Sequence, residues 1–175
     1  MLQSIFLAGG CFWCTEAIFL SLEGVSEVIP VYTGGTSENP TYKDICTGES
    51  GHAEAIKCVF DTNKISLSKI LEVFFKTHNP TELNKQGRDI GTQYRSEIFI
   101  TNKAQLEEVK KAITDAEVLW KSEVHTKISM MEKFYVAENY HHNYYANNKE
   151  VAYCKFVIKP KLENLKKDFK KILKV

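Results

Sequence analysis

The order in which strand-like and helix-like stretches follow one another constrains the fold of this chain most. Apolar runs and alternating patterns predict strands at residues 4–8, 52–61, 94–101, 126–132 and 154–158. Helical spacing of apolar residues predicts helices at residues 11–22, 66–80, 103–121 and 137–148 and after Pro160. Because the two kinds do not alternate regularly, we expect a single α+β domain, residues 1–175. We expect a two-layer sandwich with a mixed, mostly antiparallel sheet, packed helices and a ferredoxin-like core.

Two polar stretches separate these elements. Residues 33–52 and 81–93 contain many Gly, Thr, Ser and Asn residues and predict loops. Loops as long as the first usually carry function in a compact domain. We therefore expect functional residues in residues 33–52.

Charge and hydropathy exclude several classes of function. The net charge of +1 provides no electrostatic field for capturing nucleic acid or a membrane surface. No stretch reaches the roughly 18 apolar residues of a membrane span. The first residues also lack the basic start and long apolar run of a signal peptide. We therefore expect a cytoplasmic monomer with no nucleic-acid or membrane partner.

The turn "GGC" ends the first predicted strand and begins the first predicted helix. Gly9 and Gly10 permit a sharp turn, which places Cys11 near a helix N-terminus. Unpaired N–H groups there favour a negative charge, so we expect a lowered pKa for Cys11 and a nucleophilic thiolate. The alternative interpretation is a small buried apolar residue.

The second cysteine of "CFWC" follows one helical turn later. In a cytoplasmic protein, where cysteines are mostly reduced, Cys11 and Cys14 have the spacing of a redox dithiol. A zinc site would need a second pair of ligands, and no His or Cys has that spacing, so we expect no metal. Phe12 and Trp13 place two apolar rings beside the sulfur, which suggests a substrate with a small apolar group.

An acidic residue follows the first long loop. In "HAEAIKCVF", Glu54 shares one face with Ile56, Cys58 and Phe60 if the segment is a strand. On a core-facing strand, burial would keep Glu54 protonated, so that it could act as a general acid. The opposite register would leave Glu54 in solvent.

Tyrosines and histidines near the predicted loops offer further polar groups. Tyr42, in "NPTY", and Tyr94, in "GTQYRS", could each donate a hydrogen bond to a polar substrate atom, although packing is the commoner use of tyrosine. Glu138 and His141 form one E-x-x-H unit. Because a second unit is missing, we expect His141 and His142 to pack or hydrogen-bond near the site.

Five motifs together resemble one family. In chain order they are "GGCFWCTEAIF", "NPTY", "GHAEAI", "LNKQGRDIGTQYRS" and "AENYHHNYY". From residue 4 to about residue 160 the chain is similar to peptide methionine sulfoxide reductase A. Members of that family reduce the S epimer of methionine sulfoxide, free or in proteins, and thioredoxin recycles them without an organic cofactor or metal.

The resemblance assigns roles residue by residue. Cys11 would attack the sulfoxide sulfur and become a sulfenic acid, and Glu54 would protonate the sulfoxide oxygen. Phe12 and Trp13 would form the pocket for the substrate methyl group. Tyr42 and Tyr94 would hydrogen-bond the oxygen, and Asp89 would help to orient substrate or water.

Two departures from the family pattern affect these expectations. The family commonly has glycine at Cys14, and a neutral residue at Arg88, which is expected to alter the surface charge near Asp89. The resolving cysteine is either Cys14, or Cys154 in "AYC". Residues three apart on a helix have Cβ atoms about 5–6 Å apart. A disulfide needs about 3.5–4.5 Å, so Cys14 requires only a modest adjustment and is preferred.

Overall fold

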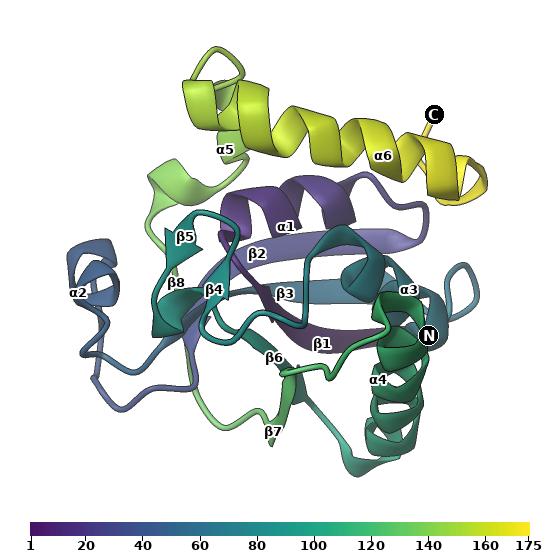
Figure 1. The fold of residues 1–175 in the computed structure, drawn as a ribbon, viewed down its shortest axis with the longest axis horizontal. Helices are drawn as coiled ribbons and strands as arrows, with labels where there is room; N and C mark the ends of the chain where they lie inside the picture. Colours follow the sequence, from purple (N-terminus) through teal and green to yellow (C-terminus); the bar gives the residue numbers. More distant parts are fainter.

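The sheet of this protein is built around a β-α-β-β-α-β core. The computed structural model describes all 175 residues (Figure 1). Its strands are β1 (Leu2–Gly9), β2 (Val25–Thr33), β3 (Ala53–Asp61), β4 (Lys85–Gln86), β5 (Asp89–Ile90), β6 (Ser96–Ile100), β7 (Lys127–Met130) and β8 (Phe134–Val136). Its helices are α1 (Phe12–Leu20), α2 (Tyr42–Thr47), α3 (Leu67–Thr77), α4 (Leu106–Trp120), α5 (Tyr144–Asn147) and α6 (Lys159–Phe169).

The main sheet has the order β7-β6-β1-β3-β2-β8. Every neighbouring pair is antiparallel except β6 and β7, which run parallel. The four inner strands, β6-β1-β3-β2, have the ferredoxin-like order, with α1 connecting β1 to β2. The predicted α+β class and the mostly antiparallel sheet are therefore confirmed.

Helices cover one face of the sheet in more than one layer. α1 packs on β1, β2 and β3, and α6 lies across the outer side of α1 (Figure 1). Because α1 is covered on both sides, it is apolar almost all round and lacks the polar face of a surface helix. On the other face of the sheet, a smaller apolar cluster forms; its buried members are Phe6, Ala8, Val31, Ala53, Ala55 and Phe99.

The strand predicted at residues 154–158 is wrong. Residues Cys154–Ile158 form a π-helical turn that runs directly into α6. A five-residue apolar run fits a buried helical turn as well as a strand, and here both sheet edges are formed by other segments. The helix predicted at 137–148 is interrupted. It is a 3-10 turn, Asn139–His141, and the short α5, separated by Asn143 in the left-handed region (φ 53°).

Several elements lie where no helix or strand is predicted. β2 carries Pro30, which is unusual in a strand, and β8 pairs with β2 only from Val31 onward. The predicted loop at 33–52 contains α2, and the loop at 81–93 contains the β4–β5 hairpin. The helices predicted at 11–22, 66–80 and 103–121 and after Pro160 are confirmed by α1, α3, α4 and α6, which begin and end within a few residues of the predicted limits.

Candidate active site

The turn between β1 and α1 places the first cysteine. Gly10 has φ +92°, and a Cβ there would lie 2.8 Å from the Cβ and Cγ of Gln86, so only glycine fits. Cys11 is the N-cap residue of α1, and its carbonyl accepts the N–H of Cys14 at 3.1 Å. The predicted helix start at Cys11 is confirmed.

The lowered pKa expected for Cys11 is wrong. Its side chain is only 8% exposed, and burial, followed by the neighbouring Glu54 and Cys14, raises the pKa of the thiol well above its usual value. The N–H of Trp13 lowers the pKa, but it does not outweigh these effects. The N–H of Phe12 donates to the carboxyl group of Glu54 (3.1 Å), so the N–H groups at the start of α1 are shared between Cys11 and Glu54.

The orientation of Glu54 is confirmed as the inward register. Its side chain is 2% exposed, and burial raises the pKa of the carboxyl group to about 8. The hydrogen bond from Phe12 lowers this pKa and the charge of Asp89 raises it, but burial has the largest effect. Glu54 therefore carries a proton at neutral pH and can act as an acid. Ala53 and Ala55 are buried too, because both faces of β3 are covered.

The two predicted tyrosines lie near the same acid and come from different elements. Tyr42 is the first residue of α2, and Tyr94 ends a 3-10 turn just before β6. Burial raises the pKa of both phenols, and the charge of Glu54 is the next largest cause for each. The structure therefore gathers Tyr42, Tyr94 and Glu54, and both phenols keep their protons for donation.

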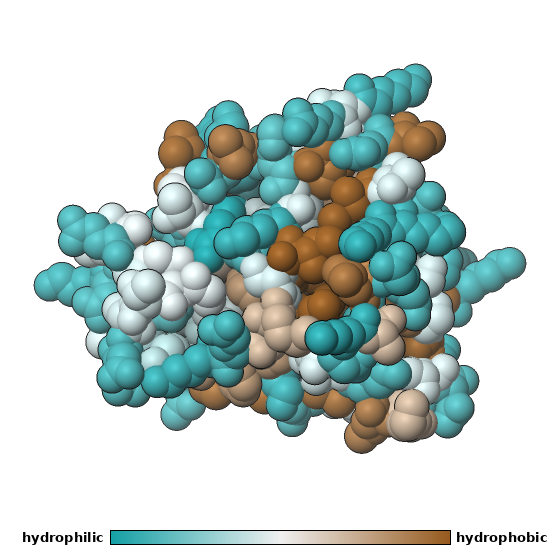
Figure 2. Space-filling view, turned by 90° about the horizontal axis from the view of Figure 1, so that it is seen from below, coloured by the Kyte–Doolittle hydropathy of each residue, from teal (hydrophilic) through white to brown (hydrophobic).

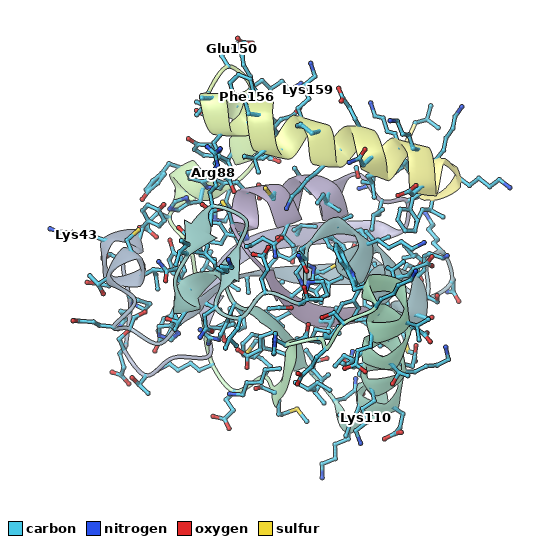
Figure 3. The ribbon with its side chains drawn as sticks, viewed as in Figure 1. Lys43, Arg88, Lys110, Glu150, Phe156 and Lys159 are labelled. Carbon is cyan, nitrogen blue, oxygen red and sulfur yellow. The ribbon has the colours of Figure 1, made fainter.

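Tyr153, a residue that the sequence did not predict for the site, links Asp89 to Cys14. The hydroxyl of Tyr153 donates to Asp89 Oδ2 at 2.7 Å and lies 3.7 Å from Cys14 Sγ. Burial and the nearby Cys11, Cys14 and Asp89 raise the pKa of Tyr153. The available signal was its place beside Cys154 in "AYC". Arg88 is exposed on the β4–β5 turn and lies below Phe156 in Figure 3.

The two rings beside Cys11 differ in exposure. Phe12 is fully buried in the main core, whereas Trp13 is half-buried. The indole of Trp13 stacks on Tyr144 (centroids 3.7 Å apart, planes at 6°), and its N–H donates to His141 Nδ1 at 2.9 Å. Trp13 therefore presents a fixed ring at the surface, and Phe12 can contribute only from below it. The predicted packing role of His141 is confirmed.

The sulfur atoms fall into separate environments. All five cysteines are free thiols. Cys14 and Cys154 belong to one small apolar cluster together with Ile158, beneath α6. Cys58 is buried in the main core, while Cys46 is exposed on α2.

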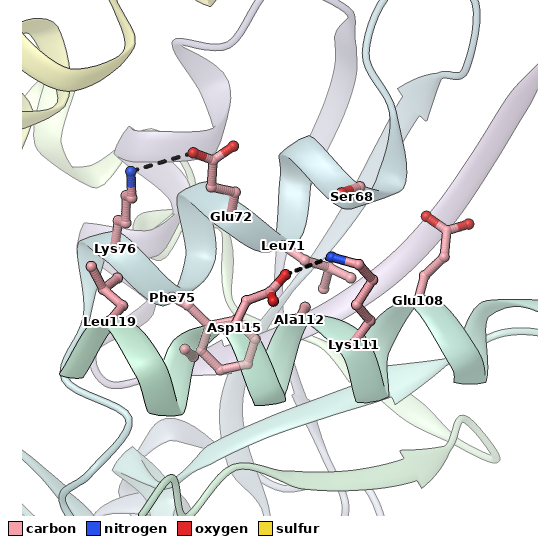
Figure 4. Close-up of a pocket in the computed structure, with 11 residues that line it drawn as sticks. Ser68, Leu71, Glu72, Phe75, Lys76, Glu108, Lys111, Ala112, Asp115 and Leu119 are labelled. Atoms are coloured by element: carbon pink, nitrogen blue, oxygen red, sulfur yellow. Dashed lines mark hydrogen bonds and ion pairs between the residues drawn. The ribbon is translucent and has the colours of Figure 1, made fainter. Parts of the chain in front are cut away.

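Other surfaces carry no comparable chemistry. A hollow of about 500 Å³ lies between α3 and α4, and an ion pair lies along each helix beside it, Lys76–Glu72 (3.3 Å) on α3 and Lys111–Asp115 (2.8 Å) on α4 (Figure 4). It contains no cysteine or histidine. Hydrophilic residues cover most of the face in Figure 2, with hydrophobic residues gathered near its middle. No three His, Cys, Asp or Glu side chains are grouped to hold a metal ion, and no helix is long and apolar enough to span a bilayer.

The fold and the site together define a cysteine-dependent enzyme. A free thiol at a helix start, a protonated carboxyl group and two phenols meet at one end of a ferredoxin-like sheet. The family described as "Peptide methionine sulfoxide reductase" matches residues 3–173, so the chain belongs to this family.

Two known proteins similar to this chain carry the same description, and a similar structure has been solved by crystallography. The chain is 47% identical to "Peptide methionine sulfoxide reductase MsrA" of Trichodesmium erythraeum over 171 residues, 97% of each protein. It is 50% identical to the Erwinia tasmaniensis protein of that name over 164 residues, covering 93% of this chain and 92% of the relative. The crystal structure of reduced Mxr1 from Saccharomyces cerevisiae has a TM-score of 0.81 and 31% identity, covering 87% of this chain and 89% of Mxr1.

Proposed function

We propose that this protein reduces the S epimer of methionine sulfoxide, free or in proteins, to methionine. The observation that carries the proposal is the hydrogen bond from Phe12 N–H to Glu54, which brings a buried acid next to the Cys11 thiol. The membership of the peptide methionine sulfoxide reductase family supports the substrate. The protein is proposed to act as a single-domain monomer in the cytoplasm.

The first step needs a nucleophile and an acid at the same sulfoxide. The Cys11 thiol loses its proton to solvent as its sulfur bonds to the substrate sulfur, while Glu54 gives its proton to the oxygen. Tyr42 and Tyr94 donate hydrogen bonds to that oxygen, and the half-buried Trp13 contacts the methyl group, with the fully buried Phe12 supporting the pocket from the core. The oxygen then passes to the Cys11 sulfur: its bond to the substrate sulfur and the new bond between the two sulfur atoms both break, methionine leaves, and Cys11 keeps the oxygen as a sulfenic acid. The substrate sulfur gains two electrons, and Cys11 loses them.

A second cysteine then converts the sulfenic acid of Cys11 to a disulfide. Its thiol displaces water from the sulfenic acid and forms a disulfide with Cys11. We assign this step to Cys14, because it lies in the first turn of α1, which Cys11 caps, whereas Cys154 is held in the π-helical turn that leads into α6. Thioredoxin would then reduce the disulfide. No metal or organic cofactor takes part in these steps.

The test measures both chemistry and sulfur pairing. Purified protein is mixed with the S or the R epimer of a blocked methionine sulfoxide, without reductant, and methionine is quantified. We expect about one equivalent from the S epimer and none from the R epimer, with peptide mapping showing a Cys11–Cys14 disulfide. Cys11→Ser should abolish the product, and Cys46→Ser, the matched control, should not. Insulin reduction without sulfoxide reduction would contradict the proposal.

A further inference from the structure

Glu138, in the "AENY" motif, has no part in the chemistry proposed above, yet its carboxylate joins two parts of the site. The hydroxyl of Tyr32 donates to Oε1 at 3.0 Å, and the backbone N–H of Tyr42 donates to Oε2 at 2.9 Å. Tyr140 adds a longer contact to Oε2 at 3.5 Å. Partial burial raises the pKa of Glu138, but the bonds from Tyr42 and Tyr32 lower it below its usual value, so the group is ionised.

One end of this connection is the start of α2. Tyr42 is the first residue of that six-residue helix, and the N–H groups of a first turn have no partner within the helix. Thr41 and Asp44 form a capping box, which satisfies the N–H groups of those two residues and leaves the N–H of Tyr42 to Glu138. The backbone from which the Tyr42 phenol projects is therefore fixed by a residue that is far away in sequence.

The other end is a strand beside the acid. Tyr32 lies directly opposite Glu54 in the β2–β3 register and is fully buried. Its ring packs against Phe12, with centroids 5.6 Å apart. β8 pairs with β2 as far as Val136, and the N–H of Ala137 bonds to the carbonyl of Pro30 at 2.9 Å, so Glu138 projects from an anchored backbone.

We infer that Glu138 is a positioning residue that fixes the Tyr42 phenol relative to Glu54, and so places the hydrogen bond to the sulfoxide oxygen. This inference rests on the proposed function, because it concerns the oxygen side of the same reaction. Glu138 touches neither sulfur nor oxygen of the substrate. Its two carboxylate oxygens connect α2, which carries Tyr42, to β2, the strand that pairs with the strand of Glu54.

The experiment separates positioning from general support of the fold. Single-turnover formation of methionine, without reductant, is measured for Glu138→Ala in three backgrounds: wild type, Tyr42→Phe and Tyr94→Phe. Small displacements of a positioned group can slow a reaction by up to about 100-fold, and we expect Glu138→Ala to slow this one by about tenfold. In the Tyr42→Phe background the further loss should be less than about twofold, because no phenol remains to be positioned. In the Tyr94→Phe background the loss of about tenfold should persist.

Two further variants complete the design. Glu49→Ala removes an exposed carboxylate that follows α2 and makes no side-chain hydrogen bond, and its rate should match that of wild type. Tyr32→Phe removes only the buried hydroxyl and should give a smaller loss with the same dependence on Tyr42. It replaces Glu138→Ala in the cycle if circular dichroism shows that the alanine variant does not fold.

The outcomes distinguish the two proposals. A wild-type protein that forms no methionine would refute the proposed function. If the wild-type protein turns over normally, either of two results would refute the positioning role. The first is a Glu138 or Tyr32 variant that keeps the full rate. The second is a loss of rate that is equal in the Tyr42→Phe and Tyr94→Phe backgrounds.

Discussion

At the scale of single residues, Glu54 shows how a functional group is kept at the expense of stability. Its carboxyl group is almost fully buried, and its one hydrogen bond, from the N–H of Phe12, does not offset the burial. Burial raises the pKa to about 8, so the folded protein holds a proton that the unfolded chain releases near pH 4.5. Unfolding free energy therefore falls as pH rises from about 4.5 to about 8.

Replacing this acid should separate activity from stability. Glu54→Gln keeps an acceptor for the Phe12 N–H but cannot ionise, so above pH 8 it avoids the cost of a buried charge. At pH 9 we expect the variant to be more stable than wild type by roughly 2–4 kcal/mol, with little difference at pH 4.5. Urea denaturation at the two pH values measures this. Sulfoxide reduction should fall by about 10²–10³-fold at pH 7. Equal stability at pH 9 would contradict the buried, protonated state.

The site residues could be predicted singly but not as a network. Pattern and resemblance pointed to Cys11 and Glu54, yet the expected lowering of the Cys11 pKa was wrong. The carboxylate that takes up the N–H of Phe12 comes from a strand 42 residues further on, and only the fold brings the two together. Tyr153 was missed for the same reason, because its partners lie on α1 and β5.

At the scale of elements, the β1–α1 turn depends on its second glycine. The Cβ of any other residue at position 10 would meet Gln86. Gln86 cannot move aside freely, because its amide accepts the N–H of Asn79 (2.9 Å) and donates to the carbonyl of Asn79 (3.0 Å). The β4–β5 hairpin therefore restricts the turn that carries Cys11.

This restriction predicts the effect of a methyl group. Gly10→Ala should lower the unfolding free energy by about 3 kcal/mol or more, from backbone strain plus the contact with Gln86. The matched control is Gly87→Ala, which also has a positive φ (58°) but meets no atom within 4 Å. It should cost only about 1–2 kcal/mol. Denaturant titration of both variants measures the difference, and equal losses would show that Gln86 yields.

Elements with a strong periodic pattern were predictable, and short ones were not. α3 and α4 have long amphipathic patterns, and their predicted limits are close to those observed. The π-helical turn Cys154–Ile158 has only five residues, and its helical form is set by α6, which follows it. β2 contains Pro30, and β8 has only three residues, so neither shows an alternating pattern clear enough to predict a strand.

At the scale of the whole molecule, the arrangement of layers leaves one sulfur in contact with water. α6 covers α1, which buries Cys14 and Cys154, and Cys58 lies in the main core. Cys11 is 8% exposed at the bottom of the site. The exposed Cys46 projects from α2, at the edge of the molecule.

Thiol titration tests this arrangement in the native protein. With a thiol-reactive dye at pH 7.5, one thiol should react quickly, and the other four should react at comparable speed only after denaturation. Burial lowers access, and the raised pKa of Cys11, Cys14, Cys58 and Cys154 lowers their thiolate fraction. Cys46→Ser should remove the fast phase. A fast phase from Cys14 or Cys154 in the Cys46→Ser variant would show that α6 does not cover these two sulfurs in solution.

The cover over Cys11 is made of the last part of the chain. Trp13 hydrogen-bonds His141 and stacks on Tyr144, and α6 covers α1. A ribosome adding 5–20 residues per second needs roughly 7–30 s to translate from codon 11 to the codons for that cover. In each nascent chain the Cys11 thiol is therefore made before Glu54, before Tyr42 and Tyr94, and before the α6 helix that covers α1. Slower translation therefore leaves the Cys11 thiol uncovered for longer before the site is complete.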